Sequence, residues 1–364
     1  MQLCTYPAHN TFHLRTIMAR GSEVESAAAQ RGAGAEPAVS TLSSILCGAV
    51  FWVLCAGLTG LLSHGHLPFR SPALTALTRP EIFFLPLIGL GWVLFELLVI
   101  YLVTRRRVAP DMASRVPSRA TARREMLALI GYAAAVLTAG VFVGHAIGHH
   151  AIGMHLPGSL FGLTDRVLPR EVWAWSAYNF VFLALLPYLV FHWRGYSREE
   201  LNLRSANVKN DTLLIFVILG LELLSEYSAL RVLFSLAPRQ LELGPPLSFI
   251  VHLLGTGLPV MIFVYSLLLP RYMKLTHSVA ATTILGAVTY ALVHLSEYWT
   301  VYDSANHAVL SVLFIILVFG APGLVKSFLT VRTGNAWVHL WAYHAIVPHV
   351  TVDTPNIVKI FGIR

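Results

Sequence analysis

Long apolar stretches alternate with shorter polar segments along most of the chain. A helix that crosses the hydrocarbon core of a bilayer needs about 20 mostly apolar residues. The pattern therefore predicts an all-α, polytopic membrane helix bundle with about nine transmembrane helices. The predicted spans cover residues 41–62, 82–103, 126–147, 173–193, 212–237, 249–269, 279–299, 308–325 and 336–352.

The composition agrees with a membrane protein. Only 12% of the 364 residues are charged, whereas soluble domains carry about 25% charged residues. The net charge of +8 does not predict a nucleic-acid partner, because the basic residues fall in loops between the spans, where membrane topology places them. The three cysteines provide neither a disulfide framework nor a CxxC metal site.

The order of the spans and the loop charges predict three regions and an orientation. Residues 1–40 are polar and are expected to form a disordered tail, residues 41–193 hold four spans, and residues 194–364 hold the other five. Four loops carry 15 Lys and Arg residues, and the alternate loops carry 5. Because basic loops remain cytoplasmic, we expect a cytoplasmic N-terminus. The basic loops are 104–125, 194–211, 270–278 and 326–335.

Ionisable side chains interrupt the fifth predicted span. An ionisable group inside a membrane helix costs about 2.5–3.5 kcal/mol on insertion scales, so it usually faces the interior of the bundle and marks a functional site. Glu222 and Glu226 are four residues apart and share one helix face. Arg231 aligns better with Tyr227 than with Glu226. These groups predict either a functional site or a buried ion pair that fixes helix packing.

The seventh predicted span carries a second polar face. Tyr290, His294 and Glu297 are spaced by four and three residues, which places them on one side of a helix. Glu297 is positioned to accept a hydrogen bond from His294 and to set its tautomer. Two alternatives stay open. His294 could form its hydrogen bond with a neighbouring helix, or Glu297 could face water.

The ninth predicted span holds three histidines and a proline. His339, His344 and His349 are spaced by five residues, so on an α-helix they spiral around the axis and do not all face one site. Pro348 removes a backbone hydrogen bond and is expected to bend or end this helix.

Three of these spans, in this order, resemble the CAAX protease and bacteriocin-processing family of intramembrane glutamic endopeptidases, related to the type II CAAX prenyl endopeptidases. That family carries EExxxR, FxxxH and HxxxN or HxxxD on separate membrane helices. The segment from Glu226 to Arg231 matches the first motif, with Tyr227 in place of the second glutamate. The segment from Tyr290 to His294 matches the second motif, with tyrosine in place of phenylalanine.

The third motif has two possible registers. The sequence RTGNAWVHLWAYHAI, at 332–346, is similar to the segment that leads into this motif in the family. That alignment makes His344 the motif histidine and places Pro348 at the Asn or Asp position. Alternatively, His349 and Asp353 form an HxxxD match. The resemblance covers roughly residues 195–353.

The resemblance implies an endopeptidase in which a carboxylate and a histidine activate a water molecule, without a metal or another cofactor. Carried over, Glu226 is the general base, His294 is its partner on the water, and His344 donates to the oxyanion. Arg231 orients a carboxylate or a helix. The implied setting is a multi-pass protein of the bacterial inner membrane, in contact with membrane lipid, and the implied substrate is a peptide or protein cleaved near the membrane.

Two details of the first motif stay open. Glu222, one turn earlier, is a candidate for the carboxylate that Tyr227 replaces. Tyr227 is alternatively a hydrogen-bond partner for Arg231.

Rival functions rest on other features. The stretch GHAIGHHAIGMHLPG contains His145, His149 and His150, which match one histidine box of membrane di-iron enzymes. Those enzymes need further boxes, and no second HxxHH occurs in the chain. The departures at Tyr227 and Pro348 favour a non-catalytic scaffold or immunity protein. The charges of the fifth span would also suit a transporter path, but the pairs of broken helices typical of transporters are not evident in the sequence.

Overall fold

The computed structural model describes residues 40–159 and 167–364. Within these ranges every regular element is helical, and the one isolated bridge joins Pro157 and Ser159. The predicted all-α, polytopic fold is confirmed. The predicted disordered tail lies almost wholly outside the described residues. The α-helices are α2 (Thr41–Leu62), α3 (Pro72–Thr75), α4 (Arg79–Thr104), α5 (Arg119–Ile147), α6 (Pro169–Asn179), α7 (Leu186–Trp193), α8 (Val208–Ser225), α9 (Tyr227–Phe234), α10 (Pro238–His252), α11 (Leu258–Val260), α12 (Leu269–Thr276), α13 (Val279–Leu292), α14 (Ala305–Thr333), α15 (Ala336–His339) and α16 (Thr354–Ile360).

Short π-helical segments, with hydrogen bonds from residue i+5 to residue i, extend or connect several of these helices. They cover Phe180–Leu185, Leu253–Gly257, Met261–Leu268, Leu340–His344 and Val347–Val352, and one 3-10 turn covers Ala113–Arg115.

Among the described residues, six helical segments are long and apolar enough to cross a bilayer, and a seventh appears if the bent pair α8 and α9 counts as one span. The chain is therefore an integral, multi-pass membrane protein. The six are Thr41–Leu62, Arg79–Thr104, Arg119–Ile147, Pro169–Trp193, Pro238–Thr276 and Ala305–Thr333.

The two other predicted spans are shorter or broken. The span predicted at 279–299 forms α13, which ends at Leu292 after 14 residues, and the chain then continues without regular helix to Ser304. The span predicted at 336–352 is divided into α15 and two π-helical segments. Pro348 lies in the second π-helical segment, so the expected break in this helix is confirmed.

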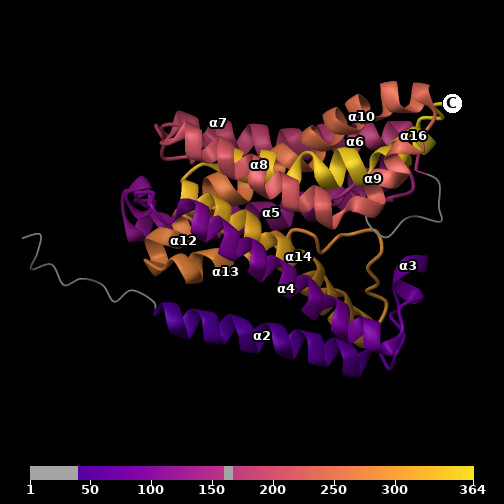
Figure 1. Ribbon diagram of the computed structural model, residues 1–364, viewed down its shortest axis with the longest axis horizontal. Coiled ribbons are helices and arrows are strands. Elements are labelled where there is room, and N and C mark those ends of the chain that lie inside the picture. Colours follow the sequence, from indigo (N-terminus) through magenta and orange to yellow (C-terminus); the bar gives the residue numbers. More distant parts are fainter. Residues whose placement is uncertain (1–39, 160–166) are drawn as a thin grey trace, which may run out of the picture. The chain divides into compact units, whose positions relative to one another are not determined.

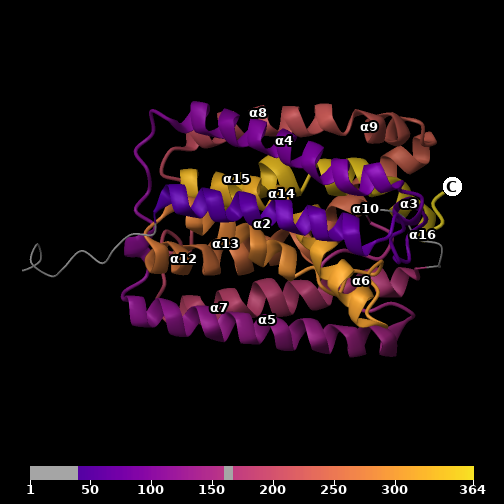
Figure 2. The same ribbon diagram turned by 90° about the horizontal axis from the view of Figure 1, so that it is seen from below.

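The helices pack in an outer and an inner set. The continuous segment from α10 to α12 has 67% of its most apolar window buried, whereas α4 has only 17%. α14 packs against α13, α4 and α2, as Figures 1 and 2 show. The outer helices therefore present apolar side chains to lipid, and the inner segments supply the interior.

The Arg-rich loops meet at one end of the bundle. The Arg107 guanidinium pairs with Asp211 of α8 and donates to the carbonyl of Thr333 at 2.7 Å. Arg115 donates to Asn202 and to the carbonyl of Gly334, at 2.9 Å for the latter. These contacts join three of the four loops predicted to share a membrane side.

Gly334 and Glu125 also contribute to the end of the bundle where the Arg-rich loops meet. Gly334 ends α14 with a φ of +65°, a left-handed conformation that glycine adopts without steric cost. The buried Glu125 carboxylate pairs with Arg271 and Arg194, each at 2.8 Å, and accepts from the Tyr196 hydroxyl at 2.9 Å. The fourth basic loop is thereby held at the same end.

At the opposite end, two irregular segments fold into the bundle. They are 148–159, between α5 and α6, and 293–304, between α13 and α14. The carbonyl of Gly153 accepts from the Trp175 indole at 3.1 Å and from the Asn179 amide at 2.9 Å. A Cβ at Gly153 would meet the carbonyl oxygen of Ser296 at 2.8 Å, so the two segments approach through glycine backbone. α6 therefore positions the segment that carries His155.

Candidate functional site

The candidate site lies beside a break in an apolar helix. α8 ends at Ser225 and α9 begins at Tyr227, and their axes differ by 78°. Glu226 is the residue between them. The Ser225 hydroxyl donates to the Glu222 carbonyl at 2.8 Å, a local side-chain bond of the kind that bends helices. Irregular backbone at membrane depth is stable where it lines a cavity.

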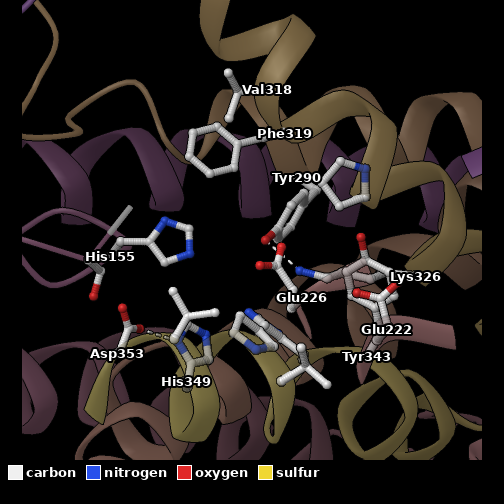
Figure 3. Close-up of a pocket in the computed structure, with 16 residues that line it drawn as sticks. His155, Glu222, Glu226, Tyr290, Val318, Phe319, Lys326, Tyr343, His349 and Asp353 are labelled. Carbon is white, nitrogen blue, oxygen red and sulfur yellow. Dashed lines mark hydrogen bonds and ion pairs between the residues drawn. The ribbon is translucent and has the colours of Figure 1, made fainter. Parts of the chain in front are cut away.

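An interior cavity of about 230 Å³ adjoins this break. Figure 3 shows His155, His349 and Asp353 on one side of it, and Glu222, Glu226 and Lys326 on the other. These side chains come from widely separated parts of the chain, so the fold assembles the cavity. Its polar lining comprises His155, Ser159, Glu222, Glu226, Tyr290, Lys326, Tyr343, His344, His349 and Asp353.

A second, more apolar cavity of about 600 Å³ adjoins the first. It lies along α4 and α14, and its lining includes Trp92, Phe314 and Leu317. Glu222 and Glu226 line both cavities. The broken helix therefore separates an apolar space from a polar one and places its two carboxylates at the boundary.

The π-helical segments bring histidines five residues apart onto the same side. The amide of Ala345 donates to the carbonyl of Leu340 at 2.8 Å, an i+5 to i bond. His344 ends the first π-helical segment after α15 and His349 lies in the second, with residues 345–346 outside regular helix between them. This departure from a continuous α-helix leaves the ring centroids of His344 and His349 5.2 Å apart. Both line the cavity, whereas His339 packs against Tyr265, with centroids 4.2 Å apart. The expectation that the three histidines do not all face one site is confirmed, because His339 lies away from the cavity that His344 and His349 share.

Buried carboxylates hold two of the cavity histidines. The Nδ1 of His155 lies 3.1 Å from Glu297 Oε1, and the His155 amide donates to the same oxygen at 3.2 Å. The Nδ1 of His349 lies 2.8 Å from Asp353 Oδ2. Two registers were predicted for the third motif. In the register that uses His349 and Asp353, the two motif side chains are in direct contact.

Several ring nitrogens of the histidines in and beside the cavity have no hydrogen-bond partner among the described residues. They are both ring nitrogens of His344, the Nε2 of His349 and the Nε2 of His294. A buried polar atom without a partner costs about 1–3 kcal/mol. A water, an ion or a substrate in the cavity would supply the missing partners of these nitrogens.

Three sets of side chains have ligand atoms within 4.8 Å of one another. All three sets are buried and overlap through His155 or His349. They are His155 with His344 and His349; His155 with His294 and Glu297; and His252 with His349 and Asp353.

Tyr290 and Lys326 form a polar contact on the other wall. The Lys326 ammonium donates to the Tyr290 hydroxyl and lies 3.9 Å from the centroid of that ring. Lys326 is only 2% exposed. It stands one residue beyond the predicted end of the eighth span, and sequence reasoning assigned it to a basic loop. α14 continues to Thr333, so Lys326 lies inside the bundle.

His294 and Glu297 are both buried but do not hydrogen-bond to each other. The Nδ1 of His294 contacts the carbonyl of Tyr290, and its ring stacks on Phe319 with centroids 4.0 Å apart. Glu297 instead holds His155. His294 is not among the residues that line the cavity with Glu226. His294 therefore packs against His155, which lines the cavity, with ring centroids 4.6 Å apart.

The remaining residues of the first motif diverge at the helix break. Tyr227 is 62% exposed and Arg231 is also exposed, whereas Glu222 is 6% exposed. Glu222 and Glu226 both line the cavity, so Glu222 stays a candidate for the carboxylate that Tyr227 replaces. In the part of the chain that the structure describes, no ion pair joins Arg231 to Glu226.

The histidine-box stretch contributes through a different histidine. His145 and His149 are exposed, and His150 is buried with its Nδ1 at 3.0 Å from Glu171 Oε1. These three do not appear together in any cluster with metal-ligand spacing in the described ranges. His155, from the same stretch, is the residue that enters the interior cluster.

Sequence reasoning also missed His252. Its Nε2 lies 3.2 Å from Asp353 Oδ2, and its ring stacks on His349 with centroids 4.8 Å apart. The criterion that singled out His294, an ionisable group inside an apolar span, also applies to His252 in the predicted span 249–269.

Comparisons with known proteins identify no relative: no family model, no curated protein and no solved structure matches the chain.

Proposed function

We propose that the chain is an intramembrane endopeptidase, similar in its chemistry to the CAAX protease family that its motifs resemble, and that the reaction takes place in the cavity beside Glu226. The observation that carries the proposal is the position of Glu226. It stands at the break between α8 and α9 and lines one cavity with His155, His344 and His349. General acid–base chemistry needs groups within hydrogen-bond reach of a bound water or substrate, and this cavity has room for both.

In the proposed reaction, the Glu226 carboxylate removes a proton from a water molecule. The water oxygen bonds to the carbonyl carbon of the substrate, and His344 stabilises the oxyanion that develops. The C–N bond then breaks, and the proton held by Glu226 passes to the leaving nitrogen. Lys326 and Tyr290 line the same cavity and provide further donors.

The adjoining apolar cavity favours a substrate that comes from the membrane. Its walls are formed largely by α4 and α14, and it meets the polar cavity at Glu222 and Glu226. A hydrophobic peptide segment would lie in the apolar space, with its scissile bond at the boundary. We therefore infer that the substrate is a peptide or protein whose cleavage site lies in or near the bilayer.

We infer a location in the bacterial inner membrane with a cytoplasmic N-terminus. The loop charges support this orientation, because the Arg-rich loops meet at one end of the bundle. The cavity then lies toward the opposite, outer side.

The experiment is a comparison of protein termini in membranes from cells that express the natural chain or Glu226→Gln. The proposal predicts new peptide termini, located in or beside apolar segments, only with the natural chain. Tyr227→Phe serves as the matched control, because Tyr227 is the adjacent residue but is exposed. Its set of termini is expected to equal that of the natural chain.

An unchanged set of termini in Glu226→Gln would contradict the proposal and favour a non-catalytic membrane scaffold or immunity protein. The amount of folded protein in the membrane must be equal in both samples, because loss of the chain would also remove the termini.

A further inference from the structure

Three buried imidazoles converge at the polar cavity. One ring nitrogen from each of His155, His344 and His349 lies within 4.8 Å of those of the other two. They come from the irregular segment 148–159 and from the two π-helical segments after α15. We propose that these three histidines bind one divalent transition-metal ion, and that this ion is zinc.

The neighbouring carboxylates prepare two of the histidines for metal binding. A histidine that binds a metal through one nitrogen usually donates its other N–H to a carboxylate, which fixes the tautomer and the ring orientation. Glu297 has this relation to the Nδ1 of His155, and Asp353 has it to the Nδ1 of His349. In both rings Nε2 is therefore the nitrogen left for an ion.

The unpartnered nitrogens are a second, independent observation. His344 and His349 are 1% and 2% exposed. Both nitrogens of His344 and the Nε2 of His349 lack a hydrogen-bond partner among the described residues. No group among the described residues satisfies these atoms, and an ion shared by the three rings would satisfy one nitrogen of each ring.

The donor set and the surroundings favour zinc. Imidazole suits Zn, Cu, Fe and Ni, and catalytic zinc has three protein ligands with a fourth position open to water or substrate. Zn–N bonds of about 2.0–2.1 Å hold ligating nitrogens about 3.4 Å apart, so small rotations of the rings bring the three onto one ion. The three histidines line the same cavity as Glu226, so that cavity would hold the water or substrate. Zinc does not change its oxidation state, which matches a hydrolytic reaction.

The ion changes the roles proposed for the cavity. When bound, zinc would supply Lewis-acid stabilisation of the oxyanion and lower the pKa of a bound water. His344 would then act as a metal ligand instead of an oxyanion donor, and the site would differ from the metal-independent one that the resemblance implies. Glu226 remains the group that accepts the proton of the water. This catalytic role and the choice of zinc among the transition metals rest on the proposed function, whereas the binding of a divalent ion rests only on the geometry of the three histidines.

The experiment measures zinc content. The full-length chain is purified in detergent, incubated with Zn²⁺, passed over a desalting column and analysed by mass spectrometry of the metal. The natural chain is expected to retain about one zinc per chain. His155→Ala, His344→Ala and His349→Ala are each expected to lose it. His145→Ala is the matched control, an exposed histidine near the same loop, and should retain zinc.

Two further variants keep the result interpretable. Asp353→Asn leaves all three ligands in place but removes the carboxylate on His349, so zinc affinity should fall by about 10–100-fold. Glu226→Gln should retain zinc even if it loses cleavage, which separates a failure of the metal site from a failure of the peptidase. Size-exclusion profiles report whether each variant is folded.

A natural chain that retains no more zinc than His344→Ala would overturn the inference. Full retention of zinc in all three folded alanine variants would also overturn it, because the ion would then lie elsewhere.

Discussion

The two ends of the bundle both bury charged and polar groups, but they treat them differently. At the Arg-rich end, the buried groups are paired: Glu125 contacts Arg271, Arg194 and Tyr196. At the opposite end, called the histidine-rich end here, His155, His344 and His349 line the polar cavity. His344 has no partner for either ring nitrogen among the described residues. A buried group without a partner lowers stability, so the paired groups stabilise the first end, whereas the unpaired imidazole at the second end supports the proposed ligand site.

The difference has a counterpart in the backbone. At the Arg-rich end the contacting groups, such as Arg271 on α12, lie near helix ends and on the loops that connect the helices. At the histidine-rich end, α8 breaks at Glu226 and the segment after α15 is π-helical. These breaks turn side chains into the cavity that regular α-helices would direct elsewhere, and π-helical turns are frequent at functional sites.

The largest expected effect is on catalysis at the histidine-rich end. Glu226→Gln removes the proposed base while leaving its size unchanged, and general acid–base groups contribute about 10²–10⁴-fold to rates. We expect cleavage to fall by about that factor, with little change in thermal stability. Cleavage of a peptide identified from the terminus comparison provides the measurement. A rate within twofold of the natural chain would remove Glu226 from the mechanism.

The next effect concerns stability at the Arg-rich end. Glu125→Ala leaves Arg271 buried without its carboxylate, and breaking a buried ion pair costs about 3–5 kcal/mol. We expect the free energy of unfolding in detergent to fall by about that amount, while zinc content per folded chain stays the same. Chemical unfolding followed by tryptophan fluorescence measures this. A loss of zinc without a loss of stability would contradict the proposed division between the two ends.

A smaller effect of opposite sign is expected at the histidine-rich end. His344→Leu replaces a buried imidazole that lacks partners with an apolar side chain, and such replacements are neutral or stabilising. With zinc removed by a chelator, we expect the variant to be as stable as the natural chain or more stable by about 0.5–2 kcal/mol. Thermal unfolding in the presence of the chelator tests this. A destabilisation comparable to that of Glu125→Ala would indicate that His344 serves packing.

The smallest effect is expected at Arg231. The resemblance gives this residue an orienting role, but the structure leaves it exposed on α9 beyond the helix break. Surface substitutions usually change stability by about 0.5 kcal/mol or less. We expect Arg231→Ala to leave both stability and cleavage close to those of the natural chain. A large loss of cleavage in the same assay would restore the role that the motif implies.

The fold was largely predictable because a long apolar stretch in a membrane must pair its own backbone groups, which favours a helix. α2, α4 and α5 follow the predicted spans closely. The predictions were less accurate where helices are broken. α13 ends at Leu292 and the segment after Asn335 becomes π-helical, and hydropathy carries no information about either change.

The candidate site was predictable only in part. Glu226, His344 and His349 were found because an ionisable side chain in an apolar span is conspicuous. His155 and Lys326 were not assigned to the site, since one lies on an irregular segment and the other just beyond a predicted span end. Their places depend on contacts such as that between Gly153 and Ser296, which join segments far apart in the sequence.

The most direct test of the account is the effect of Zn²⁺ on thermal unfolding of the natural chain and of His344→Leu. A ligand that binds only the folded state at a concentration 100 times its Kd stabilises that state by about 2.7 kcal/mol. The account predicts that Zn²⁺ raises the unfolding temperature of the natural chain and leaves that of His344→Leu unchanged. Equal responses of the two proteins, or no response in either, would contradict the claim that the three histidines bind zinc.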